Sequence, residues 1–317
     1  MLDLSKKPYY LADEQIHQLQ SKVQTMTLDE KIGQLFFVIG QDEDQVDIKE
    51  FIKTYRPGGM MYRPASAEKI KRQLTTAQAA SDIPLFFSAN LESGGNGIIT
   101  EGTWFGMPLQ IAATDDPEQA YELGNVAGNE AAQVGCNMSF SPIVDIDLNF
   151  RNPITNTRTF GSDPKRVIQM ASAQIKGLEK NSILPVIKHF PGDGVDERDQ
   201  HLLSTVNSLS VDDWMNSYGQ IYQTFIDQGI SNIMIGHIML PAWEKQLSPD
   251  IKDSELRPAS ASKRLIDGLL RDELGFNGLT ITDATPMIGY NSILPREELL
   301  PATINAGIDM ILFNKNI

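Results

Sequence analysis

The chain has 317 residues, 41% of them hydrophobic, which is enough for one large domain or two small ones and excludes a disordered chain. Its 27 basic and 41 acidic side chains give a formal net charge of -14, so we expect no nucleic-acid partner. Because Cys136 is the only cysteine, an intrachain disulfide and a cysteine-cluster metal site are excluded.

The first residues lack the apolar segment of a signal peptide. The longest apolar runs, such as residues 230–240, fall short of the ~20 residues that span a bilayer. We therefore expect a soluble, cytoplasmic protein with no membrane span. Nothing in the sequence indicates the oligomeric state.

Short β-rich segments alternate with longer helical patterns along the chain. Residues 27–30, Thr-Leu-Asp-Glu, have the spacing of a capping box, and helices are predicted at 117–134, 164–180, 211–228 and 263–273. Strands are predicted at 35–39, 59–62, 85–89, 138–144, 185–190, 232–238, 279–282 and 310–313. Eight alternating units favour an α/β fold of the (β/α)8 TIM-like barrel type over an open doubly wound sheet.

The end of the chain fits this barrel imperfectly. The eighth predicted strand ends at residue 313 and the sequence at Ile317, which leaves no room for an eighth covering helix. We expect a single barrel domain over residues 1–317 that is truncated before a C-terminal region. The alternative is that an N-terminal helix near 13–23 fills the last outer position.

Polar side chains of chemically active types follow most of the predicted strands. Active sites of (β/α)8 barrels form at the carboxyl ends of the strands, so these side chains can be considered together. The aspartates at 145 and 147 lack the rest of a calcium loop, and the glycines at 94–97 match no nucleotide-binding motif, so neither a metal nor a cofactor is indicated. The set comprises Asn90, Glu92, Asp145, Asp147, Lys188, His189, His237 and Asp283.

The most informative stretch is Lys-His-Phe-Pro-Gly-Asp-Gly at 188–194, followed by Asp-Gln-His at 199–201. A strand that ends in a basic pair and opens into a glycine- and proline-rich loop is suited to present side chains to a ligand. The alternative is an ordinary loop whose Asp199 and His201 are solvated and have no chemical role.

The other candidates also have structural alternatives. Asp283, directly after a predicted strand, is either a nucleophile or a helix N-cap. His237 is either functional or a core histidine bonded to backbone. Lys188 is either functional or a charge that neutralises neighbouring aspartates, and Asp145 is either functional or a residue that ties down a loop.

Several motifs occur in a fixed order along most of the chain. They lie at residues 26–35, 140–145, 158–164 (Arg-Thr-Phe-Gly-Ser-Asp-Pro), 188–192, 234–237 and 275–283. With these motifs the sequence resembles the catalytic barrel of glycoside hydrolase family 3, and more narrowly its β-N-acetylglucosaminidase branch.

The resemblance implies a role for each matching residue. Asp283 would be the nucleophile that forms a covalent glycosyl-enzyme. His201 would be the acid/base and Asp199 its orienting partner, because an imidazole, with an ordinary pKa near ~6.5, can both give and take a proton near neutrality. Sugar hydroxyls would be bound by Arg158, Lys188, His189, His237 and Asn90, and no cofactor would be required.

Two positions depart from the family pattern. Asp193 stands where the family usually has His, and Asn90 where it usually has Asp. Asn90 gives up the charge-assisted strength of a carboxylate, roughly 1 kcal/mol per hydrogen bond, so the hydroxyl preference is expected to differ. Asp193 would favour the imidazolium form of His201 if the two side chains are close.

The resulting expectation is a retaining exo-glycosidase that releases terminal β-linked N-acetylglucosamine from amino-sugar glycosides such as cell-wall fragments. Two alternatives remain open: a β-glucosidase or β-xylosidase, and a non-catalytic sugar-binding barrel. The use of phosphate in place of water as the acceptor is also open.

Overall fold

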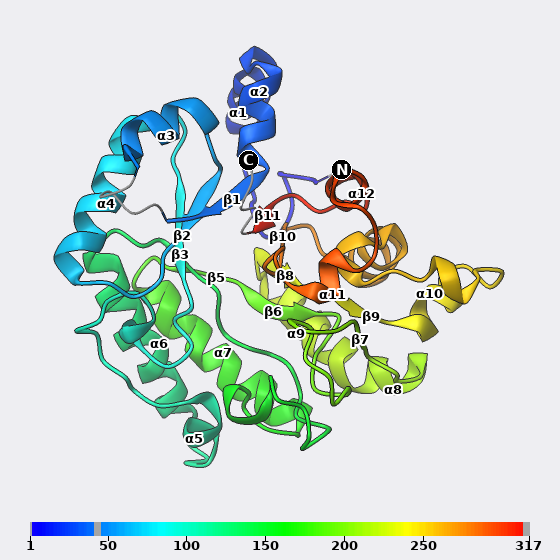
Figure 1. Ribbon diagram of the computed structural model, residues 1–317. Coiled ribbons are helices and arrows are strands. Elements are labelled where there is room, and N and C mark those ends of the chain that lie inside the picture. Colours follow the sequence, from blue (N-terminus) through cyan, green and yellow to red (C-terminus); the bar gives the residue numbers. More distant parts are fainter. Residues whose placement is uncertain (1, 41–45, 313–317) are drawn as a thin grey trace.

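Parallel strands form the wall of a barrel in the computed structural model, which describes residues 2–40 and 46–312 (Figure 1). One sheet has the order β11-β1-β2-β3-β4-β5 and a second has the order β10-β8-β6. Single bridges from Ile143 to Lys188 and from Ile281 to Met310 join the two sheets on both sides. The strands therefore close into the predicted (β/α)8 barrel.

The strands lie where the sequence places them, although several are shorter or divided. The predicted segment 138–144 forms regular ladder pairs only at its start, and 185–190 and 232–238 are each split in two. Phe313, the last residue of the eighth predicted strand, lies outside the described residues. The barrel strands are β1 (Phe36–Ile39), β2 (Gly59–Met61), β3 (Phe86–Ala89), β4 (Met138–Ser139), β5 (Leu184–Pro185), β6 (Ile187–Phe190), β8 (Asn232–Ile235), β10 (Leu279–Thr282) and β11 (Ile311–Leu312).

Helices in the connections between the strands cover the outside of the barrel (Figure 1). The predicted helix 211–228 is one continuous run interrupted by a π-helical turn, η3, and the predicted helix 263–273 is π-helical, η6. The covering helices are α3 (Ile48–Tyr55), α4 (Ala67–Ala80), α6 (Pro117–Gln133), α7 (Pro164–Lys180), α8 (Val211–Trp214), η3 (Met215–Gly219), α9 (Gln220–Gln228), η6 (Arg264–Glu273) and α12 (Arg296–Asn305).

The remaining elements lie before β1 and within the connections between the strands. The predicted capping box begins α2: the Glu30 amide donates to Thr27 Oγ1 at 3.3 Å, and the Thr27 amide donates to the Glu30 carboxylate at 2.7 Å. These elements are α1 (Asp13–Thr25), α2 (Leu28–Gln34), η1 (Gly95–Gly97), α5 (Pro108–Ala112), η2 (Asn156–Arg158), β7 (Thr205–Val206), β9 (Ile238–Met239), α10 (Pro241–Leu247), η4 (Asp253–Glu255), η5 (Ala259–Ala261) and α11 (Ile288–Asn291).

The N-terminal helix does not cover the barrel. Helix α1 buries none of its residues, and with α2 it projects beyond β1 (Figure 1). The alternative that this helix fills the last outer position of the barrel is therefore wrong. None of the described helices is long and apolar enough to cross a membrane.

Close packing of α6 on α7 supports the part of the wall that carries β4, β5 and β6. A Cβ on Gly124 would lie 2.1 Å from the Gln174 carbonyl oxygen, and one on Gly177 would lie 2.2 Å from that of Tyr121. Glycine at both positions lets the two backbones approach. Large apolar side chains fill the barrel interior, among them Phe37, Met138, Phe140, Met234, Ile281 and Met310.

Candidate active site

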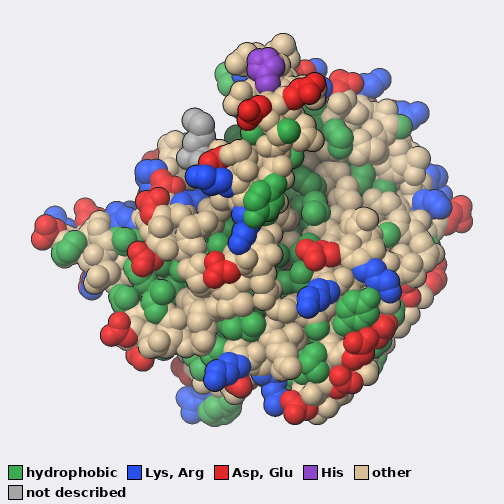
Figure 2. All heavy atoms as spheres, turned by 180° about the vertical axis from the view of Figure 1, so that it is seen from behind, with side chains coloured by type: hydrophobic (Ala, Val, Ile, Leu, Met, Phe, Trp, Pro, Cys, Tyr) green, Lys and Arg blue, Asp and Glu red, His purple; other side chains and the backbone are tan. Residues whose placement is uncertain are grey.

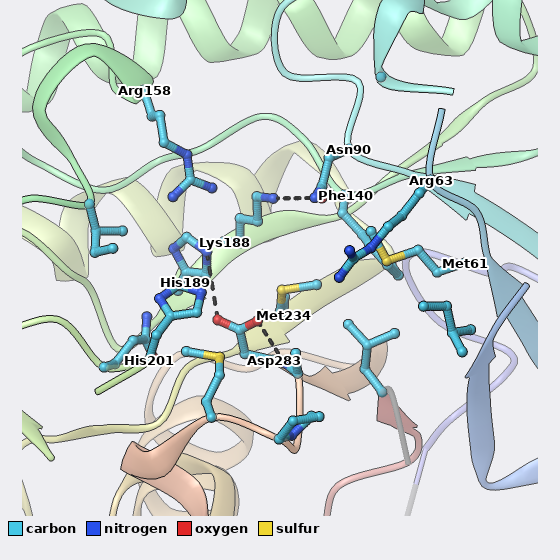
Figure 3. Close-up of a pocket in the computed structure, with 18 of the residues that line it drawn as sticks. Met61, Arg63, Asn90, Phe140, Arg158, Lys188, His189, His201, Met234 and Asp283 are labelled. Atoms are coloured by element: carbon cyan, nitrogen blue, oxygen red, sulfur yellow. Dashed lines mark hydrogen bonds and ion pairs between the residues drawn. The ribbon is translucent and has the colours of Figure 1, made fainter. Parts of the chain in front are cut away.

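A pocket of about 780 Å³ lies at the carboxyl ends of the barrel strands. Residues from distant parts of the chain converge there, as Figure 3 shows. Six of the eight predicted site residues line it: Asn90, Arg158, Lys188, His189, His201 and Asp283. The strand-end positions predicted from sequence therefore form one site.

Asp283 lies directly after β10, with 15% of its side chain exposed. One carboxylate oxygen, Oδ1, accepts from the Ala284 amide at 2.7 Å, and the other, Oδ2, lies 3.8 Å from His189 Nε2. Burial alone would raise the pKa of Asp283, but His189, the Ala284 amide and Lys188 outweigh it and lower the pKa below its ordinary value. The group is an ionised carboxylate on a rigid strand end, as a nucleophile requires.

His189 is fixed by Asp145, which is fully buried. Asp145 Oδ2 lies 2.6 Å from His189 Nδ1, and Oδ1 accepts from the backbone amides of His189 at 3.1 Å and Asp193 at 2.8 Å. Because a carboxylate only accepts, Nδ1 carries a proton toward Asp145, and Nε2 faces Asp283. Asp145 thus ties down a loop and orients a histidine at the same time.

Glu92 holds the two cations of the site together. Arg158 donates to both Glu92 oxygens at 2.9 Å, and Lys188 Nζ donates to Glu92 Oε1 at 2.6 Å and to Asn90 Oδ1 at 3.1 Å. Burial alone would raise the pKa of Glu92, but Lys188 and Arg158 outweigh it and hold the pKa well below its usual range. Glu92 follows β3 as predicted, but its bonds to two cations were not foreseen.

His201 and Asp199 form the predicted pair. His201 Nδ1 lies 2.7 Å from Asp199 Oδ1, which also accepts from the His201 amide at 2.8 Å. The His201 side chain is 52% exposed and lines the pocket, whereas Asp199 is 24% exposed and lies behind it. Asp199 therefore fixes one ring nitrogen, and Nε2 is the nitrogen that can exchange protons with a ligand.

His237 does not lie where a sugar-binding residue is expected. It is completely buried and outside the pocket lining, with Nδ1 2.8 Å from Ser260 Oγ and Nε2 3.2 Å from the Ala284 carbonyl oxygen. Burial lowers the pKa of His237 to about 4, so the ring is neutral. His237 therefore fits the alternative of a core histidine bonded to backbone, because both ring nitrogens already have protein partners.

Asp193 is also buried, and among the described residues its carboxylate contacts other groups than His201. Oδ1 accepts from Asn152 Nδ2 at 2.9 Å and from the Gly194 amide at 2.7 Å, and Oδ2 accepts from Gln200 Nε2 at 3.1 Å. Asp193 was expected to favour the imidazolium form of His201 if the two side chains are close, and the structure shows no such contact.

The pocket also has a wall that the sequence analysis missed. Met61 and Arg63, at and just beyond the end of β2, line it together with Phe140 and Met234, and all four point toward the space beside Asp283 (Figure 3). The signal was present: the predicted strand 59–62 is followed by a basic residue at a barrel strand end. The site therefore has a polar side and an apolar side.

The described part of the chain holds no cluster of metal ligands, and one face of the molecule shows no basic patch. Residues 2–40 and 46–312 contain no group of three or more His, Cys, Asp or Glu side chains placed to hold a metal. On the face drawn in Figure 2, basic side chains are scattered among acidic ones without forming a continuous basic patch.

A closed (β/α)8 barrel with an ionised aspartate, two histidines and a clamped cation pair at its strand ends belongs to the class of barrel enzymes. The family model described as Glycosyl hydrolase family 3 N terminal domain matches residues 27–317. The chain therefore belongs to glycosyl hydrolase family 3.

Relatives in this family carry related names. The chain is 43% identical to the "Beta-N-acetylglucosaminidase/beta-glucosidase" of Cellulomonas fimi, over all of this chain and 56% of the relative. It is 31% identical to "Beta-hexosaminidase A" of Pseudoalteromonas piscicida, over 84% of this chain and 47% of the relative. The chain thus spans about half the length of these two curated relatives.

Solved structures show the same barrel. The structure titled "Beta-glucoside phosphorylase BglX bound to 2FGlc" matches with a TM-score of 0.96 and 47% identity, over 99% of this chain and 56% of that chain. A family 3 β-N-acetylglucosaminidase from Paenibacillus sp. str. FPU-7 matches with a TM-score of 0.82 and 27% identity, over 91% and 55% of the two chains.

Proposed function

We propose that this protein is a retaining exo-glycosidase that releases terminal β-linked N-acetylglucosamine through a covalent intermediate on Asp283, with His201 and Asp199 as the acid/base pair. The observation that carries the proposal is the placement of His201 and Asp283 in one pocket, with Asp199 bonded to the far nitrogen of the imidazole. The names of the curated relatives support the sugar class.

In the first step a carboxylate oxygen of Asp283 attacks the anomeric carbon, and the bond from that carbon to the aglycone oxygen breaks. The aglycone oxygen takes the bond electrons and a proton from His201 Nε2, while Asp199 stabilises the imidazolium from which that proton comes. In the second step His201 Nε2 takes a proton from water, whose oxygen displaces Asp283 from the anomeric carbon.

The clamped cations and His189 orient the sugar. Lys188 and Arg158 share Glu92, so their charges are fixed in place before substrate binds and need little reorganisation. His189 is held by Asp145 with Nε2 toward Asp283, which places an imidazole edge beside the reacting carbon.

The choice between an N-acetylglucosaminide and a glucoside depends on the group at the 2-position of the sugar. The apolar side chains Met61, Phe140 and Met234 beside Asp283 offer contact for an acetamido methyl group, which supports the amino sugar (Figure 3). The matched test compares kcat/KM for p-nitrophenyl N-acetylglucosaminide and glucoside. A preference for the glucoside would replace the amino-sugar assignment by β-glucosidase.

The covalent step is tested with a slow substrate carrying fluorine beside the anomeric carbon and an activated leaving group. We expect the intact protein to gain the mass of one sugar, with the label on the peptide that contains Asp283. Sugar binding by calorimetry without turnover and without labelling would instead support a non-catalytic sugar-binding barrel.

Phosphate as the acceptor is a second candidate function, because a solved relative with 47% identity is titled a β-glucoside phosphorylase. In that reaction a phosphate oxygen displaces Asp283, and the product is a sugar 1-phosphate instead of a free sugar. The deciding measurement is the product ratio at a fixed substrate concentration with and without inorganic phosphate. Free sugar alone in ~10 mM phosphate would rule out this candidate.

A further inference from the structure

Between the two members of the acid/base pair lies a residue with the opposite exposure. Gln200 is completely buried, whereas the side chain of its neighbour His201 is 52% exposed. An unpaired polar group in the interior costs ~1–3 kcal/mol, so the hydrogen bonds of a buried amide stabilise the position of the segment that carries it. The side chain of Gln200 therefore links the loop that carries His201 to the interior of the protein.

The two ends of the Gln200 amide meet partners of opposite type. Nε2 donates to Asp193 Oδ2 at 3.1 Å, and Oε1 accepts from the backbone amide of His237 at 2.9 Å. A carboxylate accepts only and a backbone N–H donates only, so the amide fits in one orientation. The Gln200 backbone carbonyl accepts a third bond, from the Gly289 amide at 3.0 Å.

Both partners of the Gln200 side chain are themselves attached to the catalytic strand ends. The amide of Asp193 donates to Asp145, the carboxylate that fixes His189. The ring of His237 lies 3.2 Å from the carbonyl oxygen of Ala284, the residue that follows Asp283. Gln200 thus connects the loop of His201 to the two elements that hold the nucleophile and its neighbouring histidine.

We propose that Gln200 is a positioning residue, which through Asp193 and His237 sets where the His201 imidazole lies relative to Asp283. This inference rests on the proposed function of the His201 and Asp199 pair. It also gives Asp193 and His237 roles that differ from those expected from sequence. Both orient the acid/base loop, whereas Asp193 was expected to favour the His201 imidazolium and His237 to bind sugar hydroxyls.

Gln200 donates a hydrogen bond and Asp193 accepts it, so the contact can be tested by exchanging the amide and the carboxylate between the two positions. In D193N the new NH2 group faces the NH2 group of Gln200, and in Q200E two buried carboxylates face each other. In D193N/Q200E the carboxylate at position 200 accepts from the amide group at position 193 and from the His237 backbone amide, so every bond is restored with the same net charge. A double-mutant cycle then measures the coupling of this contact alone.

The readout is the dependence of turnover on the leaving group. Proton donation matters most when the leaving group is poor, as in an alkyl glycoside, and least when it is dinitrophenolate. A misplaced His201 therefore slows mainly the hydrolysis of the alkyl glycoside. We expect each single variant to lose ~10²-fold in kcat on the alkyl glycoside and much less on the dinitrophenyl glycoside. The double variant should recover to within ~10-fold of the wild type.

Two controls separate positioning from folding. Gln200→Met keeps the length of the side chain without its polarity and should show the same leaving-group pattern. Gln174→Met changes another buried glutamine, in α7, whose amide atoms have no hydrogen-bond partner among the described residues, and should leave kcat unchanged on both substrates. Circular dichroism and Tm confirm that each variant is folded.

The outcomes distinguish this inference from the proposed function. His201→Ala should lose far more kcat on the alkyl glycoside than on the dinitrophenyl glycoside. Equal losses of kcat on both substrates would contradict the acid/base assignment. If His201→Ala behaves as expected, then equal losses on both substrates in the Gln200 variants, or no recovery in D193N/Q200E, would overturn the positioning role alone.

Discussion

The two halves of the site are built differently. In the strand-end half, Lys188 and His189 are buried and bonded to the carboxylates Glu92 and Asp145, and Asp283 beside them is only 15% exposed. The loop half ends in His201, which is half exposed and bonded through a single carboxylate, Asp199.

The difference teaches which tasks need rigidity. A nucleophile and the groups that bind the sugar gain from being fixed before substrate arrives, because no reorganisation is then needed during reaction. A proton donor must reach an oxygen that departs and a water molecule that enters, so it needs an open side. The structure joins the two halves at Gln200, where the exposed loop meets the buried network.

The largest effect is expected at Asp283. Asp283→Asn removes the nucleophile and should lower kcat by on the order of 10⁴-fold or more, whatever the leaving group. Because the fold lowers the pKa of Asp283 and so stabilises its ionised form, the Tm should fall slightly, which cannot account for a loss of activity of this size. Steady-state kinetics on the dinitrophenyl glycoside, with Tm as the control, test this; activity within tenfold of wild type would place the nucleophile elsewhere.

The same isosteric change at two other aspartates compares the halves directly. In Asp145→Asn an NH2 group faces His189 Nδ1, which forces the other tautomer of the ring. The substitution also disrupts a buried hydrogen-bond network, so both kcat and Tm should fall. Asp199→Asn should lower kcat by ~10²-fold on poor leaving groups and change the free energy of unfolding by no more than ~0.5 kcal/mol.

Measuring kcat and Tm for both variants on alkyl and dinitrophenyl glycosides gives the contrast. Equal losses of Tm in Asp145→Asn and Asp199→Asn would mean that the loop half is as firmly built as the strand-end half.

Particular elements and residues show which parts of the fold and of the site could be predicted from the sequence. The α6 and α7 helices and all eight strand positions follow from local periodicity, and a (β/α)8 barrel brings strand ends to one face, which is why Asn90, Lys188 and Asp283 were placed together. The pairing of Asp199 with His201 was implied by the resemblance, and the structure places the two side chains in contact.

The parts that could not be predicted depend on contacts between distant segments. No local pattern shows that Gln200 lies between Asp193 and the His237 amide, because those bonds depend on how a loop packs over two strands. The same holds for Glu92, whose cations come from η2 and β6. His237 looked like a site residue because its position at a strand end does not reveal that the ring is turned into the core.

The next effect is on stability and depends on pH. Burial, with the nearby Asp145 carboxylate, raises the pKa of Asp193 to about 6, above its ordinary value of 3.8. Between these values the folded protein holds a proton that the unfolded chain has released, so the stability from this group is present at low pH and lost as pH rises through 6. The expected size is roughly 2–3 kcal/mol.

Urea unfolding between pH 4 and pH 7 tests this, with D193N as the matched comparison. The difference in free energy of unfolding, wild type minus D193N, should fall as pH rises through 6. A difference that stays constant across this range would show that Asp193 is ionised throughout.

The smallest effect is expected at Asn90, where the strand-end half departs from the family pattern. Asn90→Asp gives Lys188 a second carboxylate and offers the sugar a charged acceptor, which strengthens a hydrogen bond by about 1 kcal/mol. We expect a gain in kcat/KM of up to ~10-fold for substrates with the hydroxyl that residue 90 contacts, and no gain for the monodeoxy substrate that lacks it. A series of monodeoxy glycosides identifies that hydroxyl, whereas a uniform gain across the series would mean that the change acts through Lys188 and not through the sugar.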